Sequence, residues 1–128
     1  MTGSNRAMKR ILLIDDDPGI RHVLRRALQA GGFEVAVAAD GREGILAFEA
    51  NPADLVVTDL VMPYQDGIET ILALRKQHPL LPIIAISGVT RIKPEDSLKI
   101  ASKLGANATL EKPFSISQIV ETARKLLP

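Results

Sequence analysis

Five polar residues stand at or just beyond the ends of short apolar runs, and their side chains could do chemistry together. They are three carboxylic acids, one hydroxyl and one amine: Asp15, Asp16, Asp59, Ser87 and Lys112. Clustered carboxylates repel one another unless a cation neutralises them. The metal-ligand atoms on offer are oxygens, which favour a hard ion such as Mg²⁺. We therefore predict that Asp15, Asp16 and Asp59 bind Mg²⁺.

The same set of side chains suits phosphoryl transfer. A carboxylate nucleophile can form an aspartyl-phosphate, and a divalent cation screens its charge against the incoming phosphoryl group. The Ser87 hydroxyl and the Lys112 ammonium could then each hold a phosphoryl oxygen. The predicted chemistry is a covalent modification of a carboxylate with the help of Mg²⁺.

Short apolar runs alternate with longer amphipathic stretches, and this alternation predicts the elements that position the five residues. The runs before Asp15 and Asp59 are continuously apolar, as is typical of strands that are covered on both faces. The predicted strands cover residues 10–14, 34–38, 55–58, 82–86 and 108–111. A helical pattern follows each strand.

Local start and stop residues mark these helices. Asp17 followed by Pro18 is a strong helix start, Gly31–Gly32 stops that helix, and Ser115 is the expected N-cap of the last one. The predicted helices run from 18 to 30, from 41 to just before Pro52, from 68 to about 77, from 94 to 105 and from 115 to 127.

Five alternating strand–helix units predict an α/β fold of the flavodoxin-like (βα)5 type. Right-handed crossovers give a doubly wound parallel five-stranded sheet in the order 2-1-3-4-5. In such a sheet ligands gather outside the carboxyl ends of the strands. All five polar residues lie at those ends, so we expect them to converge on one pocket.

Composition fits one compact domain in 128 residues, with 46% hydrophobic and 24% charged residues and a net charge of +1. We assign residues 1–8 to a flexible arm or expression remnant and residues 9–128 to the domain. The absence of cysteine excludes disulfides and thiolate metal sites and suits a cytoplasmic protein. No apolar run reaches the roughly 18 residues of a membrane span. We expect no contact with membranes and no direct binding of nucleic acid.

Four motifs in chain order resemble those of the response-regulator receiver domain of two-component signalling. They are ILLIDDD at 11–17, VTDLVMPYQDG at 57–67, ISG at 86–88 and EKPF at 111–114. The resemblance covers about residues 9–127. It implies a phosphorylation-dependent switch that receives its phosphoryl group from a histidine kinase or a phosphotransfer protein. It also implies a downstream protein or output domain as partner, with a homodimer as a further alternative.

The resemblance assigns a role to each site residue. Asp59 matches the phospho-acceptor, and Asp15 and Asp16 match the acidic pair that binds Mg²⁺. The backbone carbonyl of Val61 should supply a further metal ligand. Such a domain modifies only its own Asp59, by promoting phosphoryl transfer to it and hydrolysis from it, and is not an enzyme in the usual sense.

The resemblance also assigns the switch residues. Ser87 matches the switch hydroxyl, and Lys112 matches the phosphate-pairing lysine, which usually precedes a cis proline, here Pro113. Thr109 stands where an aromatic switch residue is common. The apolar, β-branched side chains of Val61 and Val89 flank the expected path of water to the phosphoryl group, so we predict slow self-dephosphorylation.

Three other functions share part of this pattern. A degenerate receiver could act as a phosphorylation-independent interaction module, although all the site residues are retained. A flavodoxin-like cofactor module would need small and hydroxyl residues where Asp15–Asp17 stand. A metal-dependent hydrolase with an aspartate nucleophile commonly has a second aspartate two residues on, and Val61 occupies that position.

Overall fold

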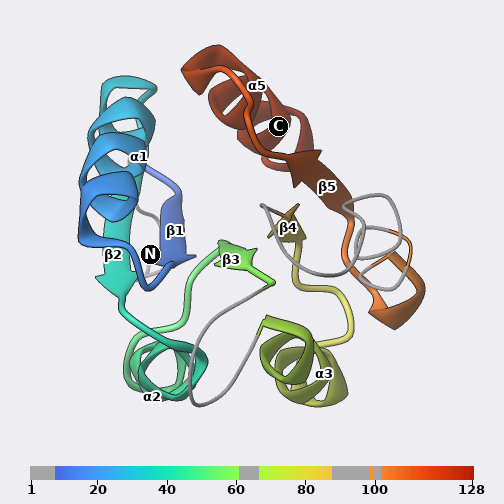
Figure 1. The fold of residues 1–128 in the computed structure, drawn as a ribbon. Helices are drawn as coiled ribbons and strands as arrows, with labels where there is room; N and C mark the ends of the chain where they lie inside the picture. The colour runs from blue at the N-terminus through green and yellow to red at the C-terminus, as the bar shows by residue number, and fades with distance from the viewer. Residues whose placement is uncertain (1–7, 61–66, 88–98, 100–101) are drawn as a thin grey trace.

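A five-stranded parallel sheet in the order β2-β1-β3-β4-β5 forms the centre of the computed structural model (Figure 1). The structure describes residues 8–60, 67–87, 99 and 102–128. The strands are β1 (Arg10–Ile14), β2 (Glu34–Ala38), β3 (Leu55–Asp59), β4 (Ile83–Ser87) and β5 (Ala108–Glu111). The predicted fold class and strand order are confirmed.

Helices cover both faces of the sheet (Figure 1). On one face lie α1 (Pro18–Ala30) and α5 (Ile116–Leu126), and on the other lie α2 (Gly41–Ala50) and α3 (Gly67–Gln77). The helix predicted at 94–105 lies largely outside the described residues, but Lys99 and residues 102–104 are helical.

Alternation along the strands builds two separate apolar cores. Every residue of β3 and β4 is buried, and so are four of the five residues of β1. Side chains such as Leu13, Val57 and Ile86 pack toward α1 and α5. Leu12 and Val56 pack toward α2 and α3. Since both faces of the central strands are covered, their continuously apolar sequences are explained.

The predicted helix caps are present. One Asp17 carboxylate oxygen accepts hydrogen bonds from the backbone N–H groups of Gly19 and Ile20, at 2.8 and 3.1 Å. Ser115 caps α5 and forms a capping box with Gln118. The first of these caps fixes how the chain leaves β1, and therefore where the acidic residues before it lie.

Two strands differ from their predicted bounds: β3 runs to Asp59, one residue beyond the predicted 55–58, and β4 is shifted by one residue. We predicted a strand over 82–86, whereas β4 runs from Ile83 to Ser87. Pro82 has no backbone N–H, so it takes part only through its carbonyl, which accepts a bond from Val56 N at 3.0 Å. Ser87 is thus the last residue of the strand instead of the first residue after it.

Candidate functional site

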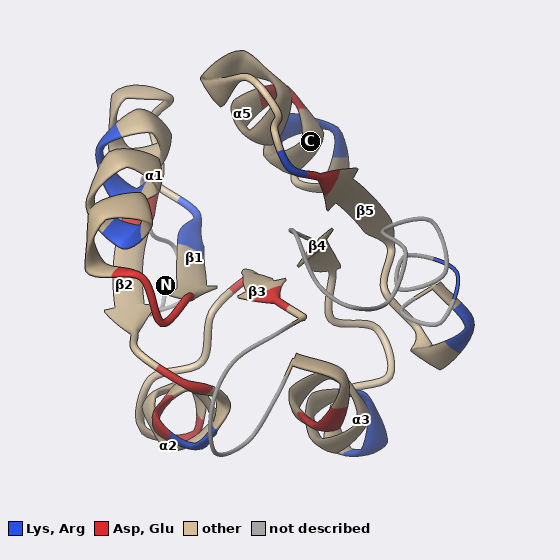
Figure 2. Ribbon diagram, viewed as in Figure 1, with Lys and Arg blue, Asp and Glu red and all other residues tan. Residues whose placement is uncertain are grey.

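The predicted site residues from four strands meet at the carboxyl edge of the sheet. Asp59 ends β3 and Ser87 ends β4, while Asp15 and Lys112 directly follow β1 and β5. Figure 2 shows acidic residues at the ends of β1 and β3, with a basic residue after β5. Asp15, Asp59 and Ser87 are only 1%, 5% and 0% exposed. Such burial of ionisable groups is costly unless they are paired, which marks the cluster as a site.

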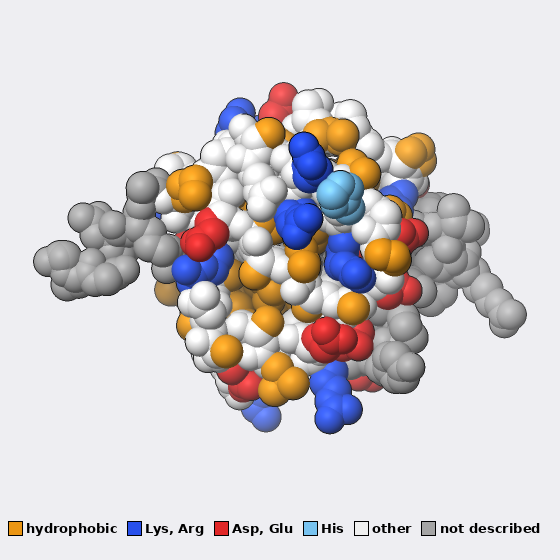
Figure 3. Space-filling model, turned by 90° about the vertical axis from the view of Figure 1, so that its left-hand side faces the viewer, with side chains coloured by type: hydrophobic (Ala, Val, Ile, Leu, Met, Phe, Trp, Pro, Cys, Tyr) orange, Lys and Arg blue, Asp and Glu red, His pale blue; other side chains and the backbone are white. Residues whose placement is uncertain are grey.

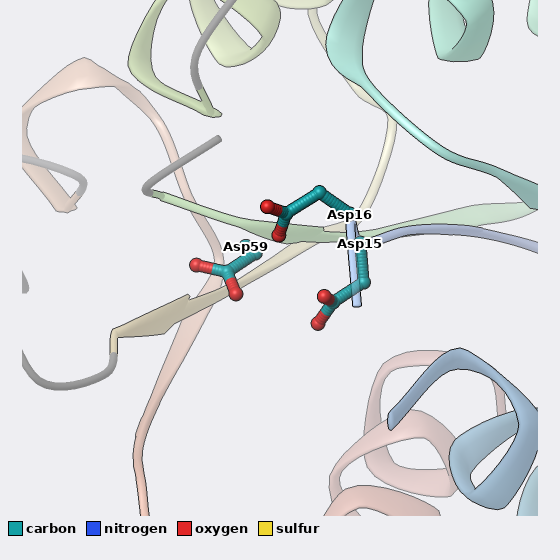
Figure 4. Close-up of side chains that lie close together, drawn as sticks. All are labelled: Asp15, Asp16 and Asp59. Carbon is teal, nitrogen blue, oxygen red and sulfur yellow. The ribbon is translucent and has the colours of Figure 1, made fainter. Parts of the chain in front are cut away.

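Three carboxylates form a cluster that could hold a cation. Asp15, Asp16 and Asp59 can each offer one oxygen atom such that all three atoms lie within 4.8 Å of one another. Figure 4 shows the three side chains gathered at the ends of the neighbouring strands β1 and β3. Asp16 is exposed while the other two are buried, so a bound ion would have a protein side and a solvent side. This is the arrangement that Mg²⁺ prefers, because it keeps part of its water shell.

The environment of Asp15 fits a bound cation. Its Oδ1 accepts a hydrogen bond from Asp17 N at 2.9 Å. Its Oδ2 is buried and accepts no hydrogen bond within the described part of the chain, although Lys112 Nζ lies 3.9 Å away. Burial, supported by the negative charge of Asp59, raises the pKa of Asp15 to about 6. A divalent cation would neutralise this buried carboxylate and occupy the Oδ2 atom that accepts no hydrogen bond from the described residues.

The cation of the site is Lys112, which pairs with Asp59. Lys112 Nζ donates a hydrogen bond to Asp59 Oδ2 at 3.0 Å. Burial alone would lower the pKa of Lys112, but the hydrogen bond and charge of Asp59 outweigh it, so the pKa is raised. The ammonium group therefore stays charged and ready to meet an anion. The expected cis bond between Lys112 and Pro113 is present.

Ser87 completes the set of predicted side chains that the structure describes. Its Oγ is fully buried and makes no hydrogen bond to any described residue. Its backbone carbonyl accepts a bond from Lys112 N at 2.7 Å, which ties the end of β4 to the residue after β5. An unused hydroxyl at this edge can serve an incoming oxygen.

Three further positions were named from the sequence, and the structure describes one of them, Thr109. Thr109 is half-buried in β5, where it pairs with Ala85. Val61 and Val89, named for the metal carbonyl and for the water path, lie outside the described residues.

Two further residues support the site and were not predicted to do so. Arg21 Nη1 donates a hydrogen bond to the backbone carbonyl of Asp15 at 2.9 Å. Figure 3 shows the surface on this side, where basic side chains gather around a histidine; this pattern alone indicates only a solvated helix face. Gly67 is required because a Cβ there would lie 2.0 Å from the carbonyl oxygen of Asp59. The Arg21 contact has no sequence motif of its own, whereas Gly67 is the last residue of the motif at 57–67.

Comparisons with known proteins agree with this geometry. The family model of the response regulator receiver domain matches residues 11–124. The chain is 34% identical over 118 residues to the transcriptional regulatory protein PrrA of Mycobacterium tuberculosis, covering 92% of this chain and 49% of that protein. It is 33% identical to the alkaline phosphatase synthesis transcriptional regulatory protein PhoP of Bacillus subtilis, with 93% and 48% covered. The chain spans about half the length of these curated relatives.

Solved structures show the same fold. The chemotaxis protein CheY4 of Vibrio cholerae superposes with a TM-score of 0.83 at 32% identity, covering 94% of this chain and 99% of that one. The receiver domain of NtrX from Brucella abortus has a TM-score of 0.85 at 29% identity, with 91% and 97% covered. Among the described residues, no helix is long and apolar enough to cross a membrane.

Proposed function

The chain belongs to the response regulator receiver domain family, and from this premise we propose that it is a phosphorylation switch whose acceptor is Asp59. The observation that carries the proposal is the Lys112–Asp59 pair at 3.0 Å beside the buried Oδ2 of Asp15. The pair places the nucleophilic carboxylate of Asp59 next to an ammonium group that can bind a phosphoryl oxygen after transfer.

We assign the metal role to Asp15, Asp16 and Asp59, with the Val61 carbonyl as a further ligand. Bound Mg²⁺ would screen the negative charge between the acceptor and the phosphoryl group. The donor set fits Mg²⁺ because it consists of carboxylate oxygens, one of which, Asp15 Oδ2, is buried and accepts no hydrogen bond from the described residues. Arg21 supports this set by holding the carbonyl of Asp15.

The transfer step needs only a small rearrangement of the protein. A carboxylate oxygen of Asp59 forms the new bond to phosphorus while the bond from phosphorus to the donor breaks, and the donor atom keeps that electron pair. Lys112 moves its Nζ from the Asp59 carboxylate to a phosphoryl oxygen. The Ser87 hydroxyl donates to another phosphoryl oxygen, because its Oγ has no described partner to leave.

These two movements would transmit the signal. The new phosphoryl group adds up to two negative charges, and Ser87 and Lys112 respond at the ends of β4 and β5. A shift there changes the β4–β5 side of the domain, which we propose as the face that contacts a downstream protein or output domain. The donor would be a histidine kinase or phosphotransfer protein, as the family implies.

The proposal is tested by intact mass after incubation with acetyl phosphate and Mg²⁺. We expect the wild type to gain one phosphoryl group and Asp59→Asn to gain none, with a chelator abolishing the gain. Lys112→Ala serves as a second variant that keeps the acceptor but should react slowly. A folded wild type that binds Mg²⁺ and gains nothing would instead favour the degenerate receiver that acts without phosphorylation.

A further inference from the structure

The amino end of β5 is held by one guanidinium group. Arg75, near the end of α3, donates from Nη2 to Gly105 O at 2.7 Å and to Asn107 Oδ1 at 3.1 Å. Its Nη1 donates to the carbonyls of His78 and Pro79, at 2.9 and 2.8 Å. All four of these acceptors are neutral oxygens, so toward the described residues this guanidinium works as a multi-donor clamp.

Asn107 connects the Arg75 clamp to β4 through two hydrogen bonds with Ile83. Its backbone N–H donates to Ile83 O at 2.8 Å, and its side-chain Oδ1 accepts from Ile83 N at 2.9 Å. The side chain thereby completes a two-bond link between the residue before β5 and the first residue of β4. Arg75 holds the same Oδ1 in place from the other side.

The register of β5 is only weakly fixed by packing, so a link of this kind matters for it. β5 has four residues, lies at the edge of the sheet and pairs only with β4. None of its residues is fully buried, so packing alone specifies its register weakly. A slip of one residue would turn every side chain to the opposite face.

Lys112 lies directly beyond the other end of this strand. The pairing runs from Ala108 opposite Ile84 to Glu111 opposite Ser87, and Lys112 N then bonds Ser87 O at 2.7 Å. The correct register is therefore what brings Lys112 Nζ within 3.0 Å of Asp59 Oδ2. The clamp and the ammonium group sit at opposite ends of one short ladder.

We propose that Asn107, held by Arg75, is a positioning residue that sets the register of β5 and so delivers Lys112 to Asp59. This role rests on the proposed function of Asp59 and Lys112 in phosphoryl transfer. Under this proposal, Arg75 and Asn107 influence the transfer rate from the amino ends of β4 and β5. They lie at the opposite end of these strands from the phosphoryl group and do not touch it.

A pair of matched variants separates the acceptor oxygen from the bulk of the side chain. Asn107→Asp keeps an Oδ acceptor for Arg75 and Ile83, whereas Asn107→Leu removes it at similar size. Asn107 is exposed, so neither change opens a cavity in the core. From the loss of two hydrogen bonds we expect Asn107→Leu to slow phosphorylation by acetyl phosphate about tenfold. Asn107→Asp should stay within about twofold of the wild type. Neither variant should lose Mg²⁺ affinity, because the acidic cluster lies at the ends of β1 and β3.

A double-variant cycle tests whether the effect passes through Lys112. In a Lys112→Ala background, Asn107→Leu should cause no further loss of rate, because the group it positions is gone. Equal tenfold losses in both backgrounds, or a parallel loss of Mg²⁺ affinity, would show a general structural effect and overturn the inference.

Hydrogen exchange at the Lys112 amide gives a readout that needs no phosphoryl transfer. Asn107→Leu should speed this exchange about tenfold while amides of β1 and β3 keep their protection. Unchanged protection of Lys112 would overturn the inference even in a protein that accepts no phosphoryl group. Failure of the wild type to react, with the expected exchange result, would overturn only the proposed function.

Discussion

The two halves of the site are built differently. The acidic half stands on β1 and β3, whose apolar side chains are buried on both faces of the sheet. The cationic half follows β5, a half-buried edge strand that is anchored at its amino end by the hydrogen bonds of Asn107 and Arg75. A phosphorylation switch needs a fixed half, which keeps its position, and a responsive half, which moves when the phosphoryl group is added. Under the proposed function, the carboxylates would form the fixed half and Lys112 would belong to the responsive half.

Two glycines offer the strongest test of this contrast. Gly67→Ala would place a Cβ 2.0 Å from the Asp59 carbonyl, a backbone atom of the fixed half. We expect a loss of about 3 kcal/mol in the free energy of unfolding. Gly105→Ala meets only the Arg75 side chain at 2.9 Å but has a φ of +113°, so its loss should be about 1–2 kcal/mol.

Urea unfolding followed by circular dichroism measures both values. Gly19→Ala is the matched control, because its Cβ would meet only the Asp17 carboxylate at 3.3 Å. If Gly105→Ala proved as damaging as Gly67→Ala, the fixed and responsive halves would not differ in rigidity as we infer.

The buried carboxylate of the fixed half should cost stability in the absence of metal. The pKa of Asp15 rises from 3.8 to about 6 in the folded protein, so the folded state favours the protonated form. Its contribution to stability is therefore present below pH 3.8 and is lost as the pH rises to about 6. Asp15→Asn should raise the unfolding free energy of the metal-free protein by about 1–2 kcal/mol at pH 7, with no gain near pH 3.

Thermal unfolding with and without Mg²⁺ at several pH values checks this prediction. Mg²⁺ should stabilise the wild type and have a much smaller effect on Asp15→Asn. A variant that is less stable than the wild type at pH 7 without metal would contradict the assigned role of burial.

The Lys112 ammonium of the responsive half should weakly oppose Mg²⁺ binding to the carboxylates. Lys112 Nζ lies near two of the proposed ligands, Asp15 and Asp59, and like charges repel. Lys112→Met should therefore raise the affinity for Mg²⁺ about threefold. It should also lower the unfolding free energy of the metal-free protein, because the buried Asp59 carboxylate loses its cationic partner. Calorimetric titration measures the affinity, and weaker Mg²⁺ binding in the variant would show that Lys112 helps to build the metal site.

Much of this architecture follows from local sequence. Continuously apolar runs predict β1 and β3, and Asp17–Pro18 predicts the start of α1, because burial and capping leave direct marks in the chain. The converging polar residues follow from topology, since parallel strands end at one edge. The helix predicted at 94–105 is described only at Lys99 and residues 102–105, of which Lys99 and 102–104 are helical.

Other features depend on contacts that no local pattern encodes. Arg75 and Asn107 are 32 residues apart, and their bond exists only because α3 ends beside the start of β5. Arg21 looks like any helix-surface arginine until the turn after β1 brings the Asp15 carbonyl within 2.9 Å. The shift of the β4 start from residue 82 to 83 reflects the missing N–H of Pro82.

The central claim is tested most directly by locating the modified residue. The protein is treated with acetyl phosphate and Mg²⁺, the acyl phosphate is reduced with borohydride to homoserine, and the peptides are sequenced by mass spectrometry. The account predicts homoserine at position 59 and nowhere else, with the signal lost when Mg²⁺ is chelated. Homoserine at Asp15 or Asp16, or at no position in a folded protein that binds Mg²⁺, would contradict it.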